Sequence, residues 1–198
     1  CDAGLSKYNL GGGMPVISNA NGQRVILVVG QVEDDASIVT GCGDIRTNAQ
    51  LVWAARQAFP KAYLIYKPHP DVAAGLRAGL VARETLRATV DLIADGADIT
   101  ELIKASDTVC TMTSLTGFEA LLHGKEVVCF GRPFYAGWGL TDDRGGAVER
   151  RVARPSLDQL VHATLIDYPR YWDPVSGEPC PPETVFERFA NGEYGAQG

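Results

Sequence analysis

The sequence predicts an α/β fold: a Rossmann-like parallel sheet of about five strands with helices on both faces. Short apolar runs rich in Val and Ile recur between residues 24 and 130, and such runs are typical of strands covered on both faces. Segments with helical periodicity and capping signals lie between them. This alternation implies right-handed βαβ crossovers and therefore a parallel sheet.

Five apolar runs are predicted as strands. The first, Val25–Val29, is nearly all β-branched and ends at Gly30. The second, at residues 62–66, ends at the Pro-His-Pro turn of residues 68–70. The remaining strands are expected at residues 90–93, 108–112 and 125–130.

Capping signals place the helices between these strands. Thr47 and Gln50 have capping-box spacing before a helix that Pro60 ends, and Asp98 begins a second capped helix that runs through Ser106. A third helix follows the fourth strand directly, with a first turn of hydroxyl and small residues. Further helical segments are expected within 71–88, over 156–166 and from 182 to near 190.

The domain organisation follows from composition. Residues 1–23 are rich in Gly, Asn and Ser and are expected to be a linker or crossover segment. Residues 24–167 are predicted to form one Rossmann-like domain, for which the family resemblance given below implies nucleotide-sugar binding. Residues 168–198 are predicted to form a Pro-rich strap and a short C-terminal helix. Because the sequence starts at Cys1, we expect it to be a piece of a longer protein.

Composition excludes several function classes. The 198 residues carry a formal net charge of −6, with Lys and Arg scattered, which argues against a broad nucleic-acid surface. The 5 cysteines form no CxxC pair, which suits a reducing cytoplasm better than a disulfide framework. No apolar run approaches a membrane span, and no signal peptide is recognisable, so we expect a cytoplasmic location.

Four loops are expected to meet at one edge of the sheet. In an open α/β sheet, ligands bind beyond the carboxyl ends of the strands. The segments that follow predicted strands there are residues 31–37, 67–71, 113–119 and 131–141. Each loop alone is a weak signal, so the case for a site at this edge depends on their convergence.

The turn at residues 67–71 presents a cation and an imidazole between prolines. Each Pro pushes the preceding residue toward extended geometry, so Lys67 and His69 are held in a stiff presentation. A rigid surface turn is the simpler interpretation of this motif alone. Beside the other loops, Lys67 and His69 suit a phosphate or a carboxylate.

The Thr113–Thr116 turn combines up to three hydroxyls with a helix start, which makes a favourable anion site. The alternative is simple capping, with Ser114 or Thr116 as N-cap and Glu119 completing a box from Thr116. Capping accounts for one hydroxyl and for Glu119. It does not account for the run of hydroxyls.

Three carboxylates, Glu33, Asp34 and Asp35, follow the first strand. A solvated loop is the ordinary explanation for such a cluster. Glu33 and Asp35 are nevertheless candidates for an acid, base or nucleophile, as carboxylate pairs are in glycosyl chemistry. Three histidines without ligand spacing and no paired cysteines predict no metal site.

Four ordered motifs resemble the KpsC-type bacterial capsule polysaccharide proteins. They stand at residues 31–38, 66–72, 111–122 and 133–141, and Ser6-Lys7-Tyr8-Asn9 resembles the family's entry to this domain. The resemblance implies a retaining β-Kdo glycosyltransferase of GT-B architecture, of which this chain would be the C-terminal, nucleotide-binding half of one module. Family members are much longer, so the chain is expected to be inactive without its acceptor-binding domain.

The resemblance also implies residue roles. Asp35 matches the acidic position proposed as the nucleophile, and Glu33 beside it is an acid/base or orienting group. His69-Pro70 matches the motif that contacts the CMP phosphate, and Ser114 and Thr116 match helix-start donors to the nucleotide. The remaining donor-binding residues are Gln31, Ser37, Lys67, Thr113 and, as a ribose-binding carboxylate, Glu119.

The implied partners are CMP-Kdo as donor, a lipid-linked glycan acceptor, the remainder of the transferase and the capsule assembly and export machinery. The implied place is the cytoplasmic face of the inner membrane, as a peripheral protein, with no cofactor or metal. Two alternatives stay open: a non-catalytic module that binds a nucleotide sugar or glycan for polysaccharide export, and a GT-B-like nucleotide-sugar epimerase.

Overall fold

The computed structural model describes residues 22–193, which form two compact units that divide after Arg154. The division lies before the predicted boundary between residues 167 and 168, so the helix expected at 156–166 belongs to the second unit. Except for residues 22 and 23, the predicted linker lies outside the described residues, as does the motif at residues 6–9.

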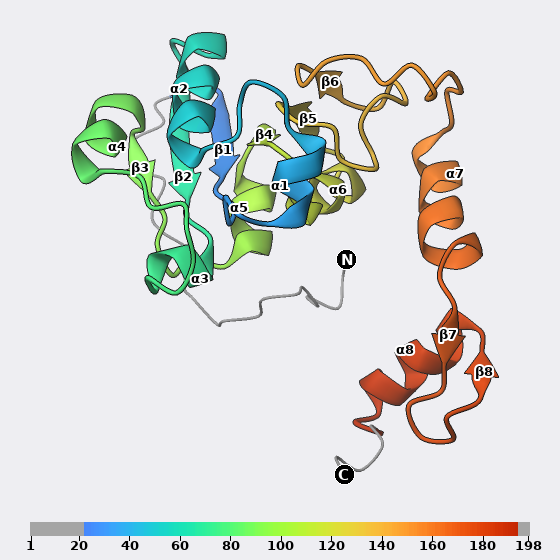
Figure 1. The fold of residues 1–198 in the computed structure, drawn as a ribbon. Coiled ribbons are helices and arrows are strands. Elements are labelled where there is room, and N and C mark those ends of the chain that lie inside the picture. The colour runs from blue at the N-terminus through green and yellow to red at the C-terminus, as the bar shows by residue number, and fades with distance from the viewer. Residues whose placement is uncertain (1–21, 194–198) are drawn as a thin grey trace. The chain divides into compact units, whose positions relative to one another are not determined.

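The first unit is built on a six-stranded parallel sheet in the order β3-β2-β1-β4-β5-β6 (Figure 1). This confirms the predicted Rossmann-like α/β fold. The sixth strand, β6, was not predicted, because its two residues are exposed aspartates without an apolar pattern. The strands are β1 (Val25–Val29), β2 (Tyr63–Lys67), β3 (Leu92–Ile93), β4 (Thr108–Thr111), β5 (Glu126–Cys129) and β6 (Asp142–Asp143).

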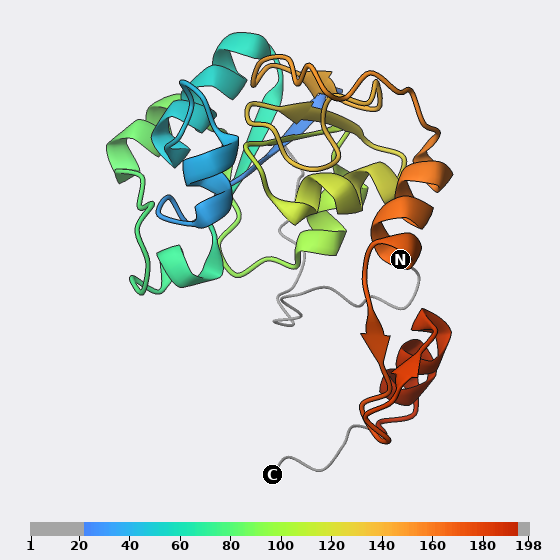
Figure 2. The same ribbon diagram turned by 45° about the vertical axis from the view of Figure 1, so that its right-hand side comes forward.

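Helices cover both faces of this sheet, as predicted. Figures 1 and 2 show α2 and α4 on one face and α5 and α6 on the other. The helices of the first unit are α1 (Ala36–Gly41), α2 (Asn48–Ala58), α3 (Pro70–Ala73), α4 (Arg83–Thr89), α5 (Ile99–Ala105) and α6 (Leu115–Leu122). Thr47 and Gln50 form the predicted capping box of α2, and Asp98 caps α5.

The main core lies between the sheet and α2. Strand side chains alternate between the two faces, and Ile26 and Val28 of β1 join a buried cluster with Leu51 and Val52 of α2. Leu27 between them is equally buried, because helices cover the other face as well. Burial on both faces is why the strands are nearly continuous apolar runs.

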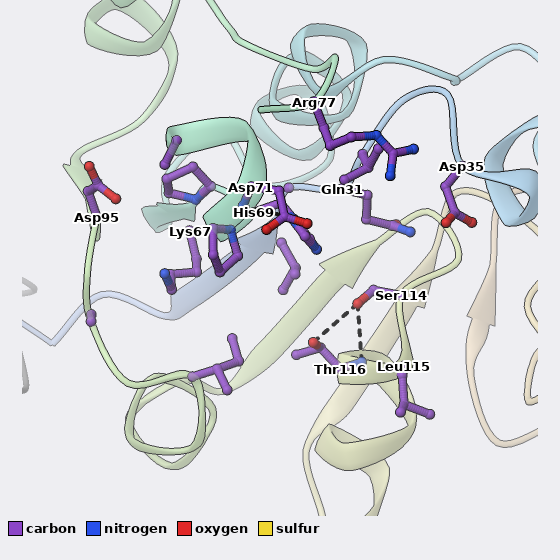
Figure 3. Close-up of a pocket in the computed structure, with 18 of the residues that line it drawn as sticks. Gln31, Asp35, Lys67, His69, Asp71, Arg77, Asp95, Ser114, Leu115 and Thr116 are labelled. Carbon is purple, nitrogen blue, oxygen red and sulfur yellow. Dashed lines mark hydrogen bonds and ion pairs between the residues drawn. The ribbon is translucent and has the colours of Figure 1, made fainter. Parts of the chain in front are cut away.

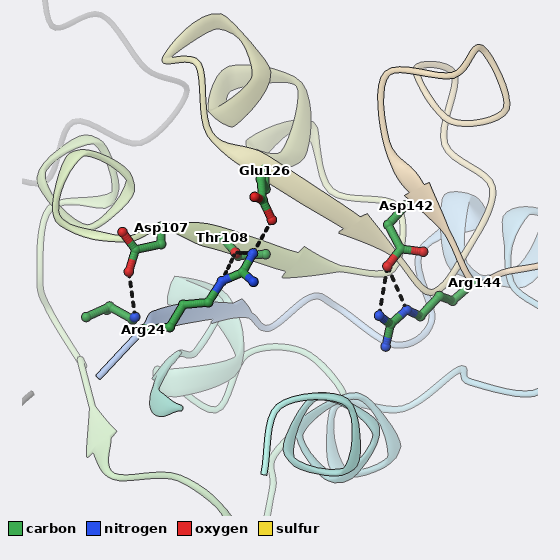
Figure 4. A network of polar contacts seen from close by, with 7 residues as sticks. Arg24, Asp107, Thr108, Glu126, Asp142 and Arg144 are labelled. Carbon is green, nitrogen blue, oxygen red and sulfur yellow. Dashed lines mark hydrogen bonds and ion pairs between the residues drawn. The ribbon is translucent and has the colours of Figure 1, made fainter. Parts of the chain in front are cut away.

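Charged side chains connect the starts of neighbouring strands at the amino edge of the sheet (Figure 4). Arg24 donates to the Thr108 hydroxyl at 2.7 Å and forms an ion pair with Glu126. The Asp107 carboxylate accepts the Val25 amide at 2.8 Å. These groups stabilise the starts of three strands.

The second unit contains a helical segment, a small hairpin and a terminal helix. Its first helix begins where the sequence predicted one, and Ser156 caps it with a capping box to Gln159. The hairpin β7–β8 lies within the predicted strap, and Arg188 binds Asp173 beside it. The elements are α7 (Leu157–His162), a π-helical turn (Ala163–Asp167), β7 (Tyr171–Trp172), β8 (Pro179–Cys180) and α8 (Pro182–Ala190). Within residues 22–193, no helix combines the length and the apolarity needed to cross a membrane.

Candidate functional site

A pocket of about 520 Å³ lies at the carboxyl edge of the sheet, where the loops after β1, β2, β3 and β4 meet (Figure 3). Strand order reverses between β1 and β4, and this switch point is where open α/β sheets bind ligands. All the predicted site residues except Glu33 line it: Gln31, Asp35, Ser37, Lys67, His69, Pro70, Thr113, Ser114, Thr116 and Glu119.

Gln31 joins the loop after β1 to the turn after β4. Its side-chain amide donates to the Thr113 hydroxyl at 3.0 Å, and its Oε1 accepts the Thr113 amide at 2.8 Å. Oε1 also accepts the Thr111 hydroxyl at 3.2 Å. These bonds hold the two loops at a fixed spacing across the pocket.

Asn48 is a supporting residue that sequence reasoning missed. Its fully buried side chain donates to the carbonyls of Gln31 and Gly79 at 2.7 and 2.8 Å and accepts the Gln31 amide at 2.9 Å. Gly79 has a φ of +131°, and a Cβ there would stand 2.8 Å from the Gln31 carbonyl. In the sequence, Asn48 is indistinguishable from an ordinary polar residue in a first helical turn.

The two acidic candidates have different surroundings. Asp35 lines the pocket as N-cap of α1, and its Oδ1 accepts the Ser37 amide at 2.8 Å. Glu33 lies outside the pocket lining, and its Oε1 accepts the Asn48 amide at 2.7 Å. A carboxylate there stabilises the positive N-terminus of α2, so the structure does not bring Glu33 into the pocket with Asp35.

His69 is oriented by its own turn. It is the N-cap of α3, and its Nδ1 accepts the Asp71 amide at 3.2 Å. An accepting Nδ1 assigns the proton of the neutral imidazole to Nε2. His69 therefore presents an N–H donor from a half-buried ring that lines the pocket.

Lys67 is a buried cation at the end of β2. It retains 9% of its exposure, and burial lowers the pKa of its ammonium, while Asp95 and Asp98 act in the opposite direction. Within the part of the chain that the structure describes, Nζ has neither a hydrogen bond nor an ion pair. Figure 3 shows Lys67 toward the Asp95 end of the pocket, away from Asp35.

The start of α6 forms the wall opposite His69. Ser114 is the N-cap, and its Oγ accepts the Thr116 amide at 3.2 Å (Figure 3). Of the two capping residues considered, Ser114 therefore caps α6, and no box runs from Thr116 to Glu119. Burial raises the pKa of the Glu119 carboxyl, which lies one turn further along the same wall.

The loop at residues 131–141 does not line the pocket, contrary to expectation. Its aromatic residues pack behind α6 instead: Phe134 lies 5.0 Å from Phe118 between ring centroids, and the buried Tyr135 donates to the Ser114 carbonyl. Gly117 leaves room for the Tyr135 ring. This loop supports the site from outside.

A wall at residues 95–99 was also missed. It follows β3, so the rule that predicted the other loops applies to it equally. The sequence predicted a strand at residues 90–93, but the segment after it was not counted among the converging loops. Among residues 22–193, no three His, Cys, Asp or Glu side chains group as metal ligands.

Comparisons with known proteins agree with this architecture. Residues 14–171 match the family described as capsule polysaccharide biosynthesis protein. The chain is 48% identical over 181 residues to the capsule polysaccharide modification protein LipA of Neisseria meningitidis serogroup B, across 91% of its own length. It is 47% identical over 169 residues to the lipopolysaccharide-processing protein LpsZ of Rhizobium meliloti, across 85% of its length.

Two solved structures share the fold. The KpsC β-Kdo 2,4-transferase of Thermosulfurimonas dismutans matches 94% of this chain with a TM-score of 0.81 and 37% identity. The β-Kdo 2,7-transferase from the same organism matches 87% with a TM-score of 0.78 and 39% identity.

The chain spans only part of these proteins: 25% of LipA, 38% of LpsZ, and 58% and 55% of the two KpsC chains. The family match nevertheless covers most of the present sequence. The chain therefore belongs to the capsule polysaccharide biosynthesis protein family.

Proposed function

We propose that this chain is the donor-binding half of a retaining β-Kdo glycosyltransferase in capsule assembly, with CMP-Kdo as its donor. The similarity to two KpsC Kdo transferases supports the reaction class. The observation that carries the proposal is one pocket that holds a helix N-terminus, an oriented imidazole donor and an aspartate after β1.

The donors at the centre of the pocket suit the phosphate of CMP. The first turn of α6 offers amides at the positive end of the helix dipole, together with the hydroxyls of Ser114 and Thr116. The Nε2–H of His69 lies on the neighbouring loop. Such donors stabilise the charge that develops on the phosphate as the bond to the sugar breaks.

On this proposal, Asp35 is the nucleophile. In the proposed first step, its carboxylate attacks the anomeric carbon, and the bond from that carbon to the CMP phosphate oxygen breaks. In the second step, an acceptor hydroxyl attacks the same carbon and gives up its proton to water, and the bond from that carbon to the Asp35 carboxylate breaks. Two inversions give net retention. The Ser37 amide fixes the direction of the carboxylate before the donor arrives.

The remaining parts of the reaction are assigned to a longer protein. On this proposal, the acceptor is a lipid-linked glycan, bound by a second domain of the transferase at the cytoplasmic face of the inner membrane. The capsule export machinery would take the product. The chain needs no cofactor in this scheme, because CMP-Kdo supplies the activated sugar.

Calorimetric titration of the chain with CMP tests the binding claim. His69→Ala is expected to weaken CMP binding roughly ten-fold, the loss typical of a hydrogen bond to a charged group. His123→Ala is the matched control, because His123 caps the far end of α6 and does not line the pocket. Equal CMP affinities for wild type and His69→Ala would remove His69 from the phosphate site.

A chimaera tests the nucleophile. The chain replaces the matching segment of the Thermosulfurimonas dismutans 2,4-transferase, with which it shares the fold. Asp35→Ala is expected to abolish Kdo transfer by the chimaera while the isolated chain still binds CMP. Undiminished transfer would refute the assignment and favour a non-catalytic binding module. Release of a free sugar without acceptor would favour an epimerase.

A further inference from the structure

One end of the pocket has no role in the scheme above. Lys67 lies there with two carboxylates on the 95–99 wall, Asp95 and Asp98. Figure 3 shows Lys67 and Asp95 on one side, Asp35 on the opposite side, and Ser114 and Thr116 between them.

The sheet brings these groups together. Tyr66 of β2 pairs with Ile93 of β3, and the Ala94 amide donates to the Tyr66 carbonyl at 2.8 Å. The parallel register therefore sets Lys67 beside residues 94 and 95. Asp98 is fixed as the N-cap of α5, with Oδ1 accepting the Glu101 amide at 3.0 Å. The backbone arrangement therefore places all three charged residues at this end of the pocket.

Lys67 indicates that this end receives a ligand. It is 9% exposed, lines the pocket and has no bonded partner among residues 22–193. The ammonium of this side chain can therefore donate to a molecule that enters the pocket. Neither Asp95 nor Asp98 forms an ion pair with it, so space remains between the ammonium and the carboxylates. A ligand that contacts both kinds of group here would accept a hydrogen bond from a cation and donate one to a carboxylate.

The order of groups along the pocket matches the order of parts in a nucleotide sugar. The Asp35 end suits the sugar, and the α6 N-terminus with His69 suits the phosphate. The opposite end is left for the base. We propose that Lys67, Asp95 and Asp98 read the Watson–Crick edge of cytosine: a carboxylate accepts the exocyclic N4 amino group, and Lys67 donates to N3 or O2.

This inference rests on the proposed function and adds the source of its base specificity. Cytosine N4 is a donor, and Asp is a recurrent acceptor for it. Uracil presents a carbonyl oxygen at that position and an N–H at N3. An ionised carboxylate only accepts hydrogen bonds, so it repels the uracil carbonyl. A site built this way selects cytidine over uridine nucleotides.

The test is calorimetric titration of the whole chain with CMP, UMP and 2′-deoxy-CMP. Wild type is expected to bind CMP roughly ten-fold or more tightly than UMP. In the Asp95→Asn/Asp98→Asn variant, the CMP-to-UMP ratio is expected to fall to within about three-fold of one, because an amide both donates and accepts. Asn caps helices as well as Asp does, so α5 is retained.

Asp44→Asn is the matched control, since Asp44 is an exposed carboxylate of the same unit outside the pocket. It should leave the ratio unchanged, and circular dichroism checks the fold of each variant. An unchanged CMP-to-UMP ratio in the double variant overturns the base assignment while the proposed function stands. A changed ratio of CMP to 2′-deoxy-CMP instead reassigns the carboxylates to the ribose. Absence of CMP binding by wild type overturns both proposals.

Discussion

Gly117 is the position at which one added methyl group should disturb both stability and binding. It lies in the first turn of α6, directly under the buried Tyr135 ring. A Cβ there would stand 2.8 Å from Tyr135 Cζ and 3.0 Å from Thr111 Cγ2 and would meet the phenol oxygen closest of all. Gly117→Ala therefore forces the ring or the helix to move.

The size of the effect follows from three terms. Overpacking of this kind costs about 1–3 kcal/mol. Moving the phenol away from the Ser114 carbonyl leaves buried polar groups unpaired, at a further cost of about 1–3 kcal/mol. Replacing Gly by Ala inside a helix stabilises the folded protein by about 1 kcal/mol. We expect a net loss of about 3 kcal/mol in the free energy of unfolding.

Urea unfolding followed by circular dichroism measures this loss. Gly43→Ala is the control, because a Cβ at Gly43 meets nothing within 4 Å, and it should change stability by less than about 0.5 kcal/mol. Tyr135→Phe removes the nearest atom, so the double variant should lose about 1 kcal/mol less than the two single losses combined. A Gly117→Ala variant as stable as wild type, with unchanged CMP affinity, would refute this account of the helix start.

Two further predictions concern groups outside the pocket. The Tyr66 hydroxyl is buried without a hydrogen-bond partner among the described residues. Tyr66→Phe is therefore expected to leave the free energy of unfolding unchanged or to raise it by up to about 1 kcal/mol. A loss of that size in urea unfolding would show that the hydroxyl has a partner. Arg188 and the Val175 amide hold the pKa of Asp173 at about 2, below its usual 3.8. The stability that Asp173 contributes is therefore fully present above pH 3.8 and is lost as the pH falls through 2. Hydrogen exchange of residues 182–190 should accelerate over that window. The Asp173→Asn variant should not show this pH dependence.

The sheet was predictable because its strands are buried on both faces. Continuous apolar runs such as Val25–Val29 carry that signal in themselves. The edge strand β6 carries none, since Asp142 and Asp143 are exposed and join the sheet only through the β5 backbone. Backbone pairing alone leaves no trace in the residue pattern.

The site was predictable as far as loop position determines it. The carboxyl-end rule found Asp35, His69 and Ser114, because each directly follows a recognisable strand. The same rule wrongly placed the loop at residues 131–141 in the pocket, because the Tyr135 ring packs on Gly117 behind α6. Which side of a helix a loop packs against depends on contacts between distant residues, and sequence spacing does not carry that information.

The same limit applies to Glu33. Its position beside Asp35 in the sequence suggested a shared task, yet the carboxylate binds the first turn of α2. Two side chains that are close in sequence lie apart when each accepts a hydrogen bond from a different backbone amide. The Asp35 carboxylate accepts a hydrogen bond from the Ser37 amide. The Glu33 carboxylate accepts one from the Asn48 amide.

The three hydrogen bonds of the Gln31 side chain to Thr111 and Thr113 bear on the thermodynamics of ligand binding in the pocket. They form within the chain itself, so the entropy of ordering the two loops is lost during folding. On the proposed function, a nucleotide that enters then meets a preorganised rim and has fewer side chains to immobilise. Removing this one amide should therefore appear mainly as a more unfavourable binding entropy, even though Gln31 need not touch the nucleotide.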